Sequence, residues 1–462
     1  MNLAPPIPLA SARASGIHRS ILRAALSVGA AGIVVKLIAT AKEISVAAVY
    51  GRSDAMDAFF AAALIPGLLV NLISESMNQA LVPTLVRVRE QEGRERAQQL
   101  LSSSMLCMCL LLGVAILLMA LLARFFFPLV VSNFAPAKLA LAIHLFYGLL
   151  PTVLLMGIAT SCTAVLNTLD RFALPALAPA VISVSIIVGA ACFGSRYGVW
   201  AIVSATLAGS LLHVALVAGI MRLHGYTFRL RWYGMNQATR EVAGQYGPVL
   251  LSSVVASAGL LVDQAMAAML VAGSLSALVY ANRFVSVILT LLAGAVSTAI
   301  VPYLSRLIAH RDWAGCSHTI HAWLRITALV SVPITALLVA AARPLVRAAY
   351  QHGRFGPHDT AAVASVLAMF AVQIPFYVVS RVDYRFIVAM RRTDLIFYCG
   401  LINLVLDIVL NLLFMRWFGV AGIAFATSIW MISTFFFLRY WSRRLLLMAG
   451  AGHVRNPRSI FP

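Results

Sequence analysis

Long apolar stretches separated by short polar segments dominate this chain. About 20 predominantly apolar residues are enough for a helix to cross a bilayer. Stretches of that length lie near residues 25–49, 58–85, 100–123, 139–164, 174–194, 199–220, 244–272, 276–301, 320–342, 360–388, 395–415 and 420–441. The pattern therefore predicts an all-α polytopic membrane protein with about twelve transmembrane helices.

Composition supports this fold class and excludes others. Of the 462 residues, 61% are hydrophobic and only 11% are charged, with a mean hydropathy of +0.92. Soluble domains usually carry about 25% charged residues, so an ordinary soluble protein is excluded. The net charge of +20 would suggest a nucleic-acid partner in a soluble chain. No basic motif interleaved with aromatic residues is present, and we expect no nucleic acid partner.

Most of the positive charge follows membrane topology. Outside the apolar stretches, most arginines and lysines fall in alternate segments, and these segments include both ends of the chain. Cytoplasmic loops are enriched in Lys and Arg, which predicts that both termini are cytoplasmic. The first stretch is of spanning length and contains two lysines, unlike the short core of a cleavable signal peptide, so we interpret it as a retained helix.

Two pairs of similar segments indicate an internal repeat. LVPTLVRV (81–88) resembles IVPYLSRL (300–307), and YGVWAIVSAT (197–206) resembles FGVAGIAFAT (418–427), at nearly equal spacing. The alternative is chance similarity among helices rich in Ala, Gly and Val. A duplicated six-helix unit predicts two parallel-repeat lobes of the MOP/MATE type, with a ligand site between them near the midplane. The predicted organisation is a cytoplasmic segment 1–24, an N-lobe 25–221, a linker 222–243, a C-lobe 244–441 and a basic cytoplasmic tail 442–462.

Three cations lie within predicted spans: Lys36, Lys42 and Arg283. Unpaired, they would cost roughly 8 to 10 kcal/mol to bury, so we expect them to face an internal cavity. An anionic ligand would compensate them, a diphosphate more naturally than a carboxylate. Lys36 and Glu43 share a helical face, whereas Lys42 lies about 120° away. The alternative to a shared cavity is that Lys42 and Glu43 extend to the outer membrane interface, or that Glu43 only neutralises one of the lysines.

Polar residues also recur within the predicted spans of the second half. Oxygen-bearing side chains of this kind suit a sodium ion, or one carboxylate could carry a proton. The alternative is an interhelical hydrogen-bond network that holds the bundle together. The residues concerned are Asp263, Asn403, Asp407, Asn411 and Thr427.

Further charged residues receive weaker assignments. Arg381 lies deeper in its span than Arg385 and is the better substrate-binding candidate, whereas Arg385 is expected to reach the cytoplasmic interface. Glu75 could gate the site or pair with a cation that the spacing does not identify. No catalytic motif of the HExxH, GxSxG or P-loop kind is present, so we predict a transporter rather than an enzyme.

Several motifs resemble one membrane protein family. The runs are DAFFAAALIPGLL (57–69), ALVP (80–83), NTLDRFALPALAP (167–179), YANRF (280–284), IVPYLS (300–305), YQHGRF (350–355) and GVAGIAFATS (419–428). They resemble the MurJ (MviN) lipid II flippases of the MOP exporter superfamily, over nearly the whole chain. The resemblance implies a monomeric, multi-pass inner-membrane flippase for lipid II, the polyprenyl-diphosphate precursor of peptidoglycan. It also implies alternating access by two rocking lobes, a cationic cavity for the diphosphate-sugar head group, and a tail that stays among membrane lipids.

The resemblance also assigns individual residues. Lys36 and Lys42 stand where the family usually has arginines, and Glu43 stands where it has an aspartate. Asp57 opens the DAFF motif, Arg283 matches a family arginine, and Glu43 and Asp57 are expected to tune or gate the site. In members with a sodium site, the matching ligands are Asp263, Asn403, Asp407 and Thr427.

The chain also departs from the family pattern. Val70 and Asn71 replace a basic pair, and Asn282 replaces an acidic residue. The family usually has fourteen helices, whereas twelve are predicted here. Three alternatives therefore stay open: a flippase for an exopolysaccharide or O-antigen lipid intermediate, a cation-coupled multidrug exporter, and a membrane glycosyltransferase or ligase. Cationic drugs would favour an acidic, aromatic cavity, and a transferase would need catalytic acids in a long outer loop.

Overall fold

The computed structural model describes residues 9–131, 133–169, 171 and 173–450, without the side chains of residues 9–28, 129, 256 and 298. This part of the chain consists of helices joined by short connections and contains no strand. The helices are α1 (Leu9–Tyr50), α2 (Asp54–Leu69), the π-helix η1 (Val70–Glu75), α3 (Ser76–Gln91), α4 (Arg94–Val130), α5 (Pro136–Thr168), α6 (Ala173–Leu177), α7 (Ala180–Tyr197), α8 (Trp200–Leu223), α9 (Gln237–Ala268), α10 (Ser274–Ala309), α11 (Trp313–Ala340), α12 (Ala342–Tyr350), α13 (Pro357–Ala371), α14 (Gln373–Ala389), α15 (Thr393–Phe418) and α16 (Val420–Gly450).

The hydrophobic pattern located the spans correctly. Among the described residues, 11 helices are long and apolar enough to cross a membrane, and each contains or overlaps one of the predicted stretches from 58–85 onward. The remaining stretch, 25–49, lies inside α1, which is 42 residues long and is not among the 11. The all-α membrane fold class is therefore confirmed.

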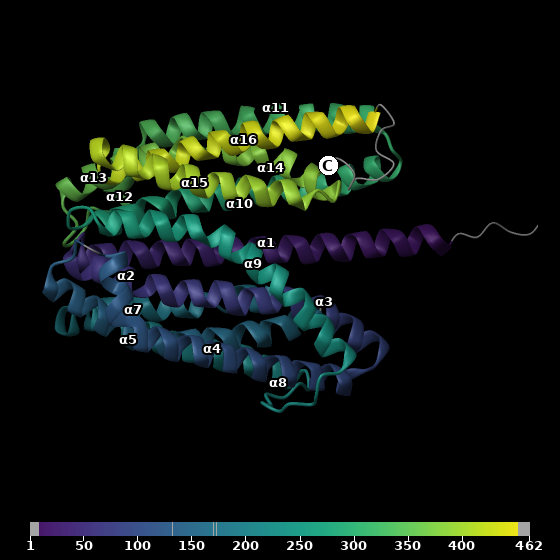
Figure 1. Ribbon diagram of the computed structural model, residues 1–462, viewed down its shortest axis with the longest axis horizontal. Helices are drawn as coiled ribbons and strands as arrows, with labels where there is room; N and C mark the ends of the chain where they lie inside the picture. The colour runs from purple at the N-terminus through teal and green to yellow at the C-terminus, as the bar shows by residue number, and fades with distance from the viewer. Residues whose placement is uncertain (1–8, 132, 170, 172, 451–462) are drawn as a thin grey trace, which may run out of the picture.

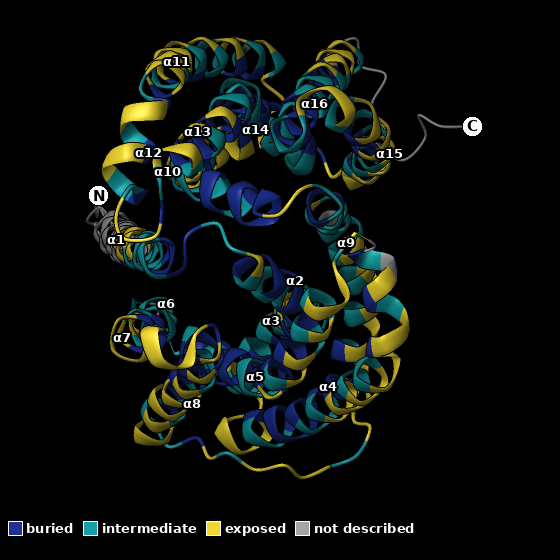
Figure 2. Cartoon of the chain, turned by 90° about the vertical axis from the view of Figure 1, so that its left-hand side faces the viewer, coloured by how far each residue is buried: buried dark blue, intermediate teal, exposed yellow. Residues whose placement is uncertain are grey.

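The helices form two groups that lie one above the other in Figure 1. We call α2–α8 with η1 the N-lobe and α10–α16 the C-lobe. Figure 2 shows α1 on one side of the space between the lobes and α9 on the other. α9 packs against α3 of the N-lobe and α15 of the C-lobe, whereas α1 packs mainly against α7 and also meets α10. These two helices therefore join the lobes.

Helix ends differ from the predicted segment boundaries. α1 begins at Leu9 instead of near residue 25, and α16 continues to Gly450 instead of ending near residue 441. The predicted linker 222–243 contains the last turn of α8, a connection, and the start of α9. Hydropathy marks where apolar side chains stop, while the backbone hydrogen bonds of a helix continue into polar sequence. Residues 1–8 and 451–462 of the predicted terminal segments lie outside the described residues.

A π-helix interrupts the span Asp54–Gln91. η1 follows Pro66, which lies inside α2. Proline cannot donate the backbone hydrogen bond that a helix interior needs, and a π segment is a frequent response to such disruption and is often found at functional sites. Asn71 of η1 lines a cavity described below, so the irregular turn faces the interior of the molecule.

The two ends of the bundle are defined by loops. We call the end with the α1–α2 connection the junction end, and the end with the α8–α9 connection the linker end. At the junction end, the α12–α13 loop crosses the end of α1, where the Arg354 amide donates a 2.9 Å hydrogen bond to the Ala48 carbonyl. Gly353 has φ +61°, and a Cβ there would collide with the Ala48 carbonyl oxygen. Only glycine permits this approach.

Gly353→Ala should therefore lower stability more than an alanine at an open left-handed position. The matched control is Gly419→Ala, because Gly419 has φ +57° but nothing within 4 Å of an added Cβ. Backbone strain costs each variant roughly 1 to 2 kcal/mol, and the collision should add about 1 to 3 kcal/mol at residue 353 only. Thermal unfolding of purified protein measures the difference, and equal losses would contradict the close approach.

Candidate functional site

The central cavity lies between the lobes within the membrane-spanning part of the molecule. It encloses about 500 Å³ and is lined by α1, α2, η1, α5, α7, α8, α9 and α10. Most of its lining is apolar and includes Phe59, Phe60 and Leu260. Its charged lining residues are Lys42, Glu43 and Arg283. Because most of the lining is apolar, these charges are screened less than they would be on an open surface.

Glu43 links the cations of the central cavity. Its side chain is buried, and its Oε1 atom lies 2.9 Å from the Lys42 Nζ atom and 2.7 Å from the Arg283 Nη2 atom. The first pair stays within α1, whereas the second joins α1 to α10 of the C-lobe. One carboxylate faces two cations, so this cluster keeps an excess positive charge. The predicted neutralising role of Glu43 therefore coexists with a cationic cavity.

A second cavity adjoins the first and contains Lys36. It encloses about 440 Å³ and shares Leu260, Gln264, Val279 and Arg283 with the central cavity. Within the described part of the chain, the Lys36 ammonium group makes no ion pair. Lys36, Lys42 and Arg283 thus line two adjoining cavities, although the two lysines project from different faces of α1. A cavity that is wide enough receives both faces of the helix.

The adjoining cavity also reaches the polar residues of the C-lobe. Asp263 and Thr427 line it. Asp263 accepts hydrogen bonds from the Asn411 amide at 2.8 Å and from the Thr427 hydroxyl at 3.3 Å. Asn411 also donates to Asp407 at 3.2 Å. Helices α9, α15 and α16 therefore converge here, and Asn411 lies between two buried carboxylates.

Asn403, the predicted ligand from the same helix, has other contacts. Its amide nitrogen donates to the Thr434 hydroxyl at 2.9 Å. Together with Asp407 and Gly259 it lines a small cavity of about 170 Å³. The buried oxygens Asn403 Oδ1, Asp407 Oδ2 and Asn411 Oδ1 have no hydrogen-bond partner among the described residues. Oxygen atoms without donors are what a hard cation requires, so the residues fit a sodium ion.

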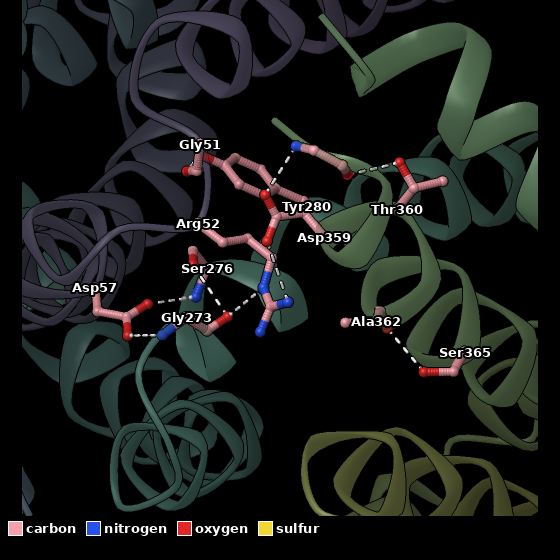
Figure 3. A network of polar contacts seen from close by, with 11 residues as sticks. Gly51, Arg52, Asp57, Gly273, Ser276, Tyr280, Asp359, Thr360, Ala362 and Ser365 are labelled. Atoms are coloured by element: carbon pink, nitrogen blue, oxygen red, sulfur yellow. Dashed lines mark hydrogen bonds and ion pairs between the residues drawn. The ribbon is translucent and has the colours of Figure 1, made fainter. Parts of the chain in front are cut away.

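Asp57 lies away from both cavities, at the junction end (Figure 3). Its carboxylate accepts hydrogen bonds from the Gly273 amide at 2.6 Å and the Ser276 amide at 2.9 Å, at the start of α10. Lys138 Nζ also lies 3.0 Å from it. The first amides of a helix lack partners within the helix, and a carboxylate satisfies them and favours the helix dipole. Asp57 of the N-lobe therefore caps a C-lobe helix.

Neighbouring residues extend this contact between the lobes. Arg52 donates to the Gly273 carbonyl at 2.9 Å and lies 3.4 Å from Asp359 at the start of α13 (Figure 3). The Tyr280 hydroxyl donates to the Gly51 carbonyl at 3.3 Å. We call Arg52, Asp57, Gly273, Ser276 and Asp359 the junction latch. Arg52 was not singled out from the sequence, because its pairing with Asp359 depends on the approach of segments 307 positions apart.

Comparison with known proteins agrees with this architecture. The family model described as "Lipid II flippase MurJ" matches residues 46–456. The chain belongs to the MurJ family. Membership in this flippase family confirms the fold, the transporter class and the lipid II flippase function that the motifs predicted.

Individual MurJ relatives match most of the chain. A probable lipid II flippase MurJ of Synechocystis sp. is 27% identical and covers 92% of this chain and 82% of its own length. The lipid II flippase MurJ of Burkholderia cenocepacia is 26% identical, with 76% and 70% covered. A solved structure of lipid II flippase MurJ in an inward closed conformation has a TM-score of 0.78 at 23% identity, with 92% and 90% covered. An inward-facing multidrug resistance MATE transporter has a TM-score of 0.74 at 12% identity, with 92% and 99% covered, so it shares the fold.

Other candidates from the MurJ motifs and the charge pattern lie elsewhere. Arg381 lines neither the central nor the adjoining cavity but a separate one between α9, α14, α15 and α16. Arg385 lies outside the lining of all these cavities, and Glu75 is exposed. Val70 and Asn71, which replace a basic pair of the MurJ pattern, both line the central cavity, so the cavity lacks those two cations.

Asp57→Asn should loosen the junction latch. An amide loses the charge that attracts the α10 amides and Lys138, which weakens helix capping. The matched control is Asp54→Asn, because Asp54 also pairs with Lys138, at 2.6 Å, but its side chain is largely exposed. In a cysteine-free background carrying Ala277→Cys, a buried position in α10, Asp57→Asn should speed maleimide labelling several-fold. Equal labelling of both variants would contradict the latch.

Proposed function

We propose that the chain translocates lipid II by binding its diphosphate between Lys36, Lys42 and Arg283. The observation that carries this proposal is the meeting of α1 and α10 cations in one apolar cavity that spans both lobes. Lysine serves a phosphate as a point charge, whereas the Arg283 guanidinium can hold two oxygens at once. One guanidinium nitrogen of Arg283 donates to Glu43, and its other guanidinium N–H groups make no hydrogen bond to a described residue. These N–H groups can therefore donate to a ligand.

In this proposal the Glu43 carboxylate pairs with Lys42 and Arg283 when no ligand is bound. A diphosphate carries more charge than a carboxylate and competes for Lys42 and Arg283. Each binding event would weaken the Glu43–Arg283 pair, which joins α1 to the C-lobe. Ligand binding then changes the relative stability of the two lobe arrangements, as alternating access requires. The polyprenyl tail would stay in the surrounding lipid.

The predicted membrane topology indicates which end of the molecule faces the outside of the cell. Under the positive-inside interpretation, both termini are cytoplasmic and the junction end faces outward. The junction latch then closes the outer side, and Asp57 acts as a gate residue rather than a direct ligand. We propose that the protein resides in the bacterial inner membrane as a monomer.

We further propose sodium as the coupling ion at Asp263, Asp407 and Thr427, with Asn403 and Asn411 supplying amide oxygens. The support is the set of buried oxygens without partners. Asp263 also lines the cavity that contains Lys36 and Arg283, so a cation here would offset repulsion between the carboxylates and attract an anionic ligand nearby.

Loss of the central cations should abolish transport. In a bacterium depleted of its lipid II flippase, this chain should restore growth and surface exposure of lipid II. Lys42→Ala and Arg283→Ala should each lower surface lipid II at least tenfold, because a charge-assisted phosphate contact contributes about 1.5 to 3 kcal/mol. The control Arg416→Ala removes a cation that lies at the far end of α15 and outside the cavity lining.

Three outcomes separate the possibilities. Rescue by both cavity variants at normal expression would refute the binding assignment. Failure of the well-inserted wild-type chain to rescue would favour a different polyprenyl-diphosphate saccharide, such as an exopolysaccharide repeat unit. Altered resistance to cationic dyes would favour a multidrug exporter.

Sodium should raise the melting temperature of the purified protein relative to choline at equal ionic strength. Ligands that bind the folded state alone stabilise it by about 2.7 kcal/mol at 100 times Kd. Asp263→Asn and Asp407→Asn should remove the sodium-dependent increase, while Asp312→Asn, at the exposed start of α11, should keep it. A wild-type protein that melts identically in both salts would contradict the sodium assignment.

A further inference from the structure

A cavity of about 720 Å³ lies between α9, α14, α15 and α16 and shares no lining residue with the central cavity. Its volume falls within the range of about 300 to 1,000 Å³ that is typical of small-molecule sites. Hydrocarbon and aromatic side chains make up much of the lining, including Val388, Ile396, Phe397 and Leu438. Among the residues of the diphosphate and sodium proposals, only Asn403 lines this cavity.

Arg381 is the one charged residue in the described lining of this cavity. Its guanidinium lies 4.1 Å from the Tyr377 ring centroid and 5.3 Å from that of Tyr384. Within the described chain it has no carboxylate partner, whereas the neighbouring Arg439 pairs with Asp383 and Arg283 pairs with Glu43. Stacking on aromatic rings orients a guanidinium but does not neutralise it.

Other polar groups surround this cation. The Tyr377 and Tyr384 hydroxyls make no hydrogen bond within the described chain, and both residues line the cavity. Asn403, which also lines the small cavity beside Asp407, lies at one edge of this lining. The lining thus combines one uncompensated positive charge and free hydroxyl donors with extensive apolar surface. This pattern favours an anionic amphiphile over an inorganic ion, because an ion would leave the apolar surface without a partner.

The depth of Arg381 agrees with a lipid head group. Arg381 lies eight residues before the end of α14 at Ala389, or roughly 12 Å along the helix axis. The short connection that follows contains Arg391 and Arg392. Under the positive-inside interpretation this end of α14 faces the cytoplasm, and a cation two turns from it is compatible with the edge of a hydrocarbon layer about 30 Å thick. Phosphate head groups are found at this depth.

We propose that this cavity binds the phosphate head group of a membrane amphiphile at Arg381, with its hydrocarbon chain along Phe397 and Leu438. The phosphate would belong either to a phospholipid or to a polyprenyl carrier lipid. In both cases the Arg381 guanidinium and the tyrosine hydroxyls donate to phosphate oxygens. This site is separate from the diphosphate site, and the inference does not depend on the proposed function.

Native mass spectrometry of the delipidated full chain tests the proposal. The probes are phosphatidylglycerol and undecaprenyl phosphate, titrated separately. Arg381→Met removes the charge while keeping much of the side-chain length, and should weaken binding of at least one probe by roughly tenfold or more. The matched control is Arg385→Met, one turn along the same helix; Arg385 also lies over Tyr384, at 5.8 Å, but outside the cavity lining.

Each outcome has a defined meaning. Weaker binding of both probes by Arg381→Met supports a general site for anionic lipids, and weaker binding of undecaprenyl phosphate alone supports a carrier-lipid site. Unchanged affinity for both probes, or an equal loss in Arg385→Met, would overturn the proposal. Because removal of a stacked arginine can impair folding, thermal unfolding is recorded first, and Arg381→Lys serves as a second variant with an intermediate loss expected.

Discussion

An excess of positive charge in an apolar cavity is the constraint on which the site depends. Lys36, Lys42 and Arg283 line two adjoining cavities, and a single buried carboxylate, Glu43, pairs with two of them. Each cation at the centre of a bilayer costs roughly 2.5 to 3.5 kcal/mol, so the arrangement persists only with partial compensation. We propose that an anionic ligand completes that compensation.

Helix α10 carries Arg283 and also belongs to the junction latch, through Ser276. α10 begins at the amides that Asp57 caps, and Arg283 lies seven residues beyond Ser276 on the same helix, about 10 Å along its axis. α1 carries Glu43 and, five residues later, the Ala48 carbonyl that the α12–α13 loop contacts. A rigid helix transmits a displacement along its length. Changes at the cation cluster and at the latch are therefore mechanically connected.

The candidate site was only partly predictable. The cations and the carboxylates of the C-lobe were identified because charged residues in apolar stretches are conspicuous and costly. The partner of Arg283 was not identified, since Glu43 lies 240 positions away in sequence. Asn411 lies between Asp263 and Asp407, although the family resemblance named Asn403 as the asparagine ligand. Arg381 was a substrate-binding candidate because of its depth in its predicted span, yet it lines a different cavity.

The sequence by itself determined the membrane fold class, the locations of the spans, and the charged residues that must be compensated. These properties are local, because hydropathy adds up along about 20 residues regardless of what surrounds them. Tertiary structure alone decided which charges meet, that Asp57 caps a helix of the other lobe, and that a π-helix follows Pro66. Those features depend on packing between helices far apart in the chain, and small differences in helix rotation decide which side chains come within bonding distance.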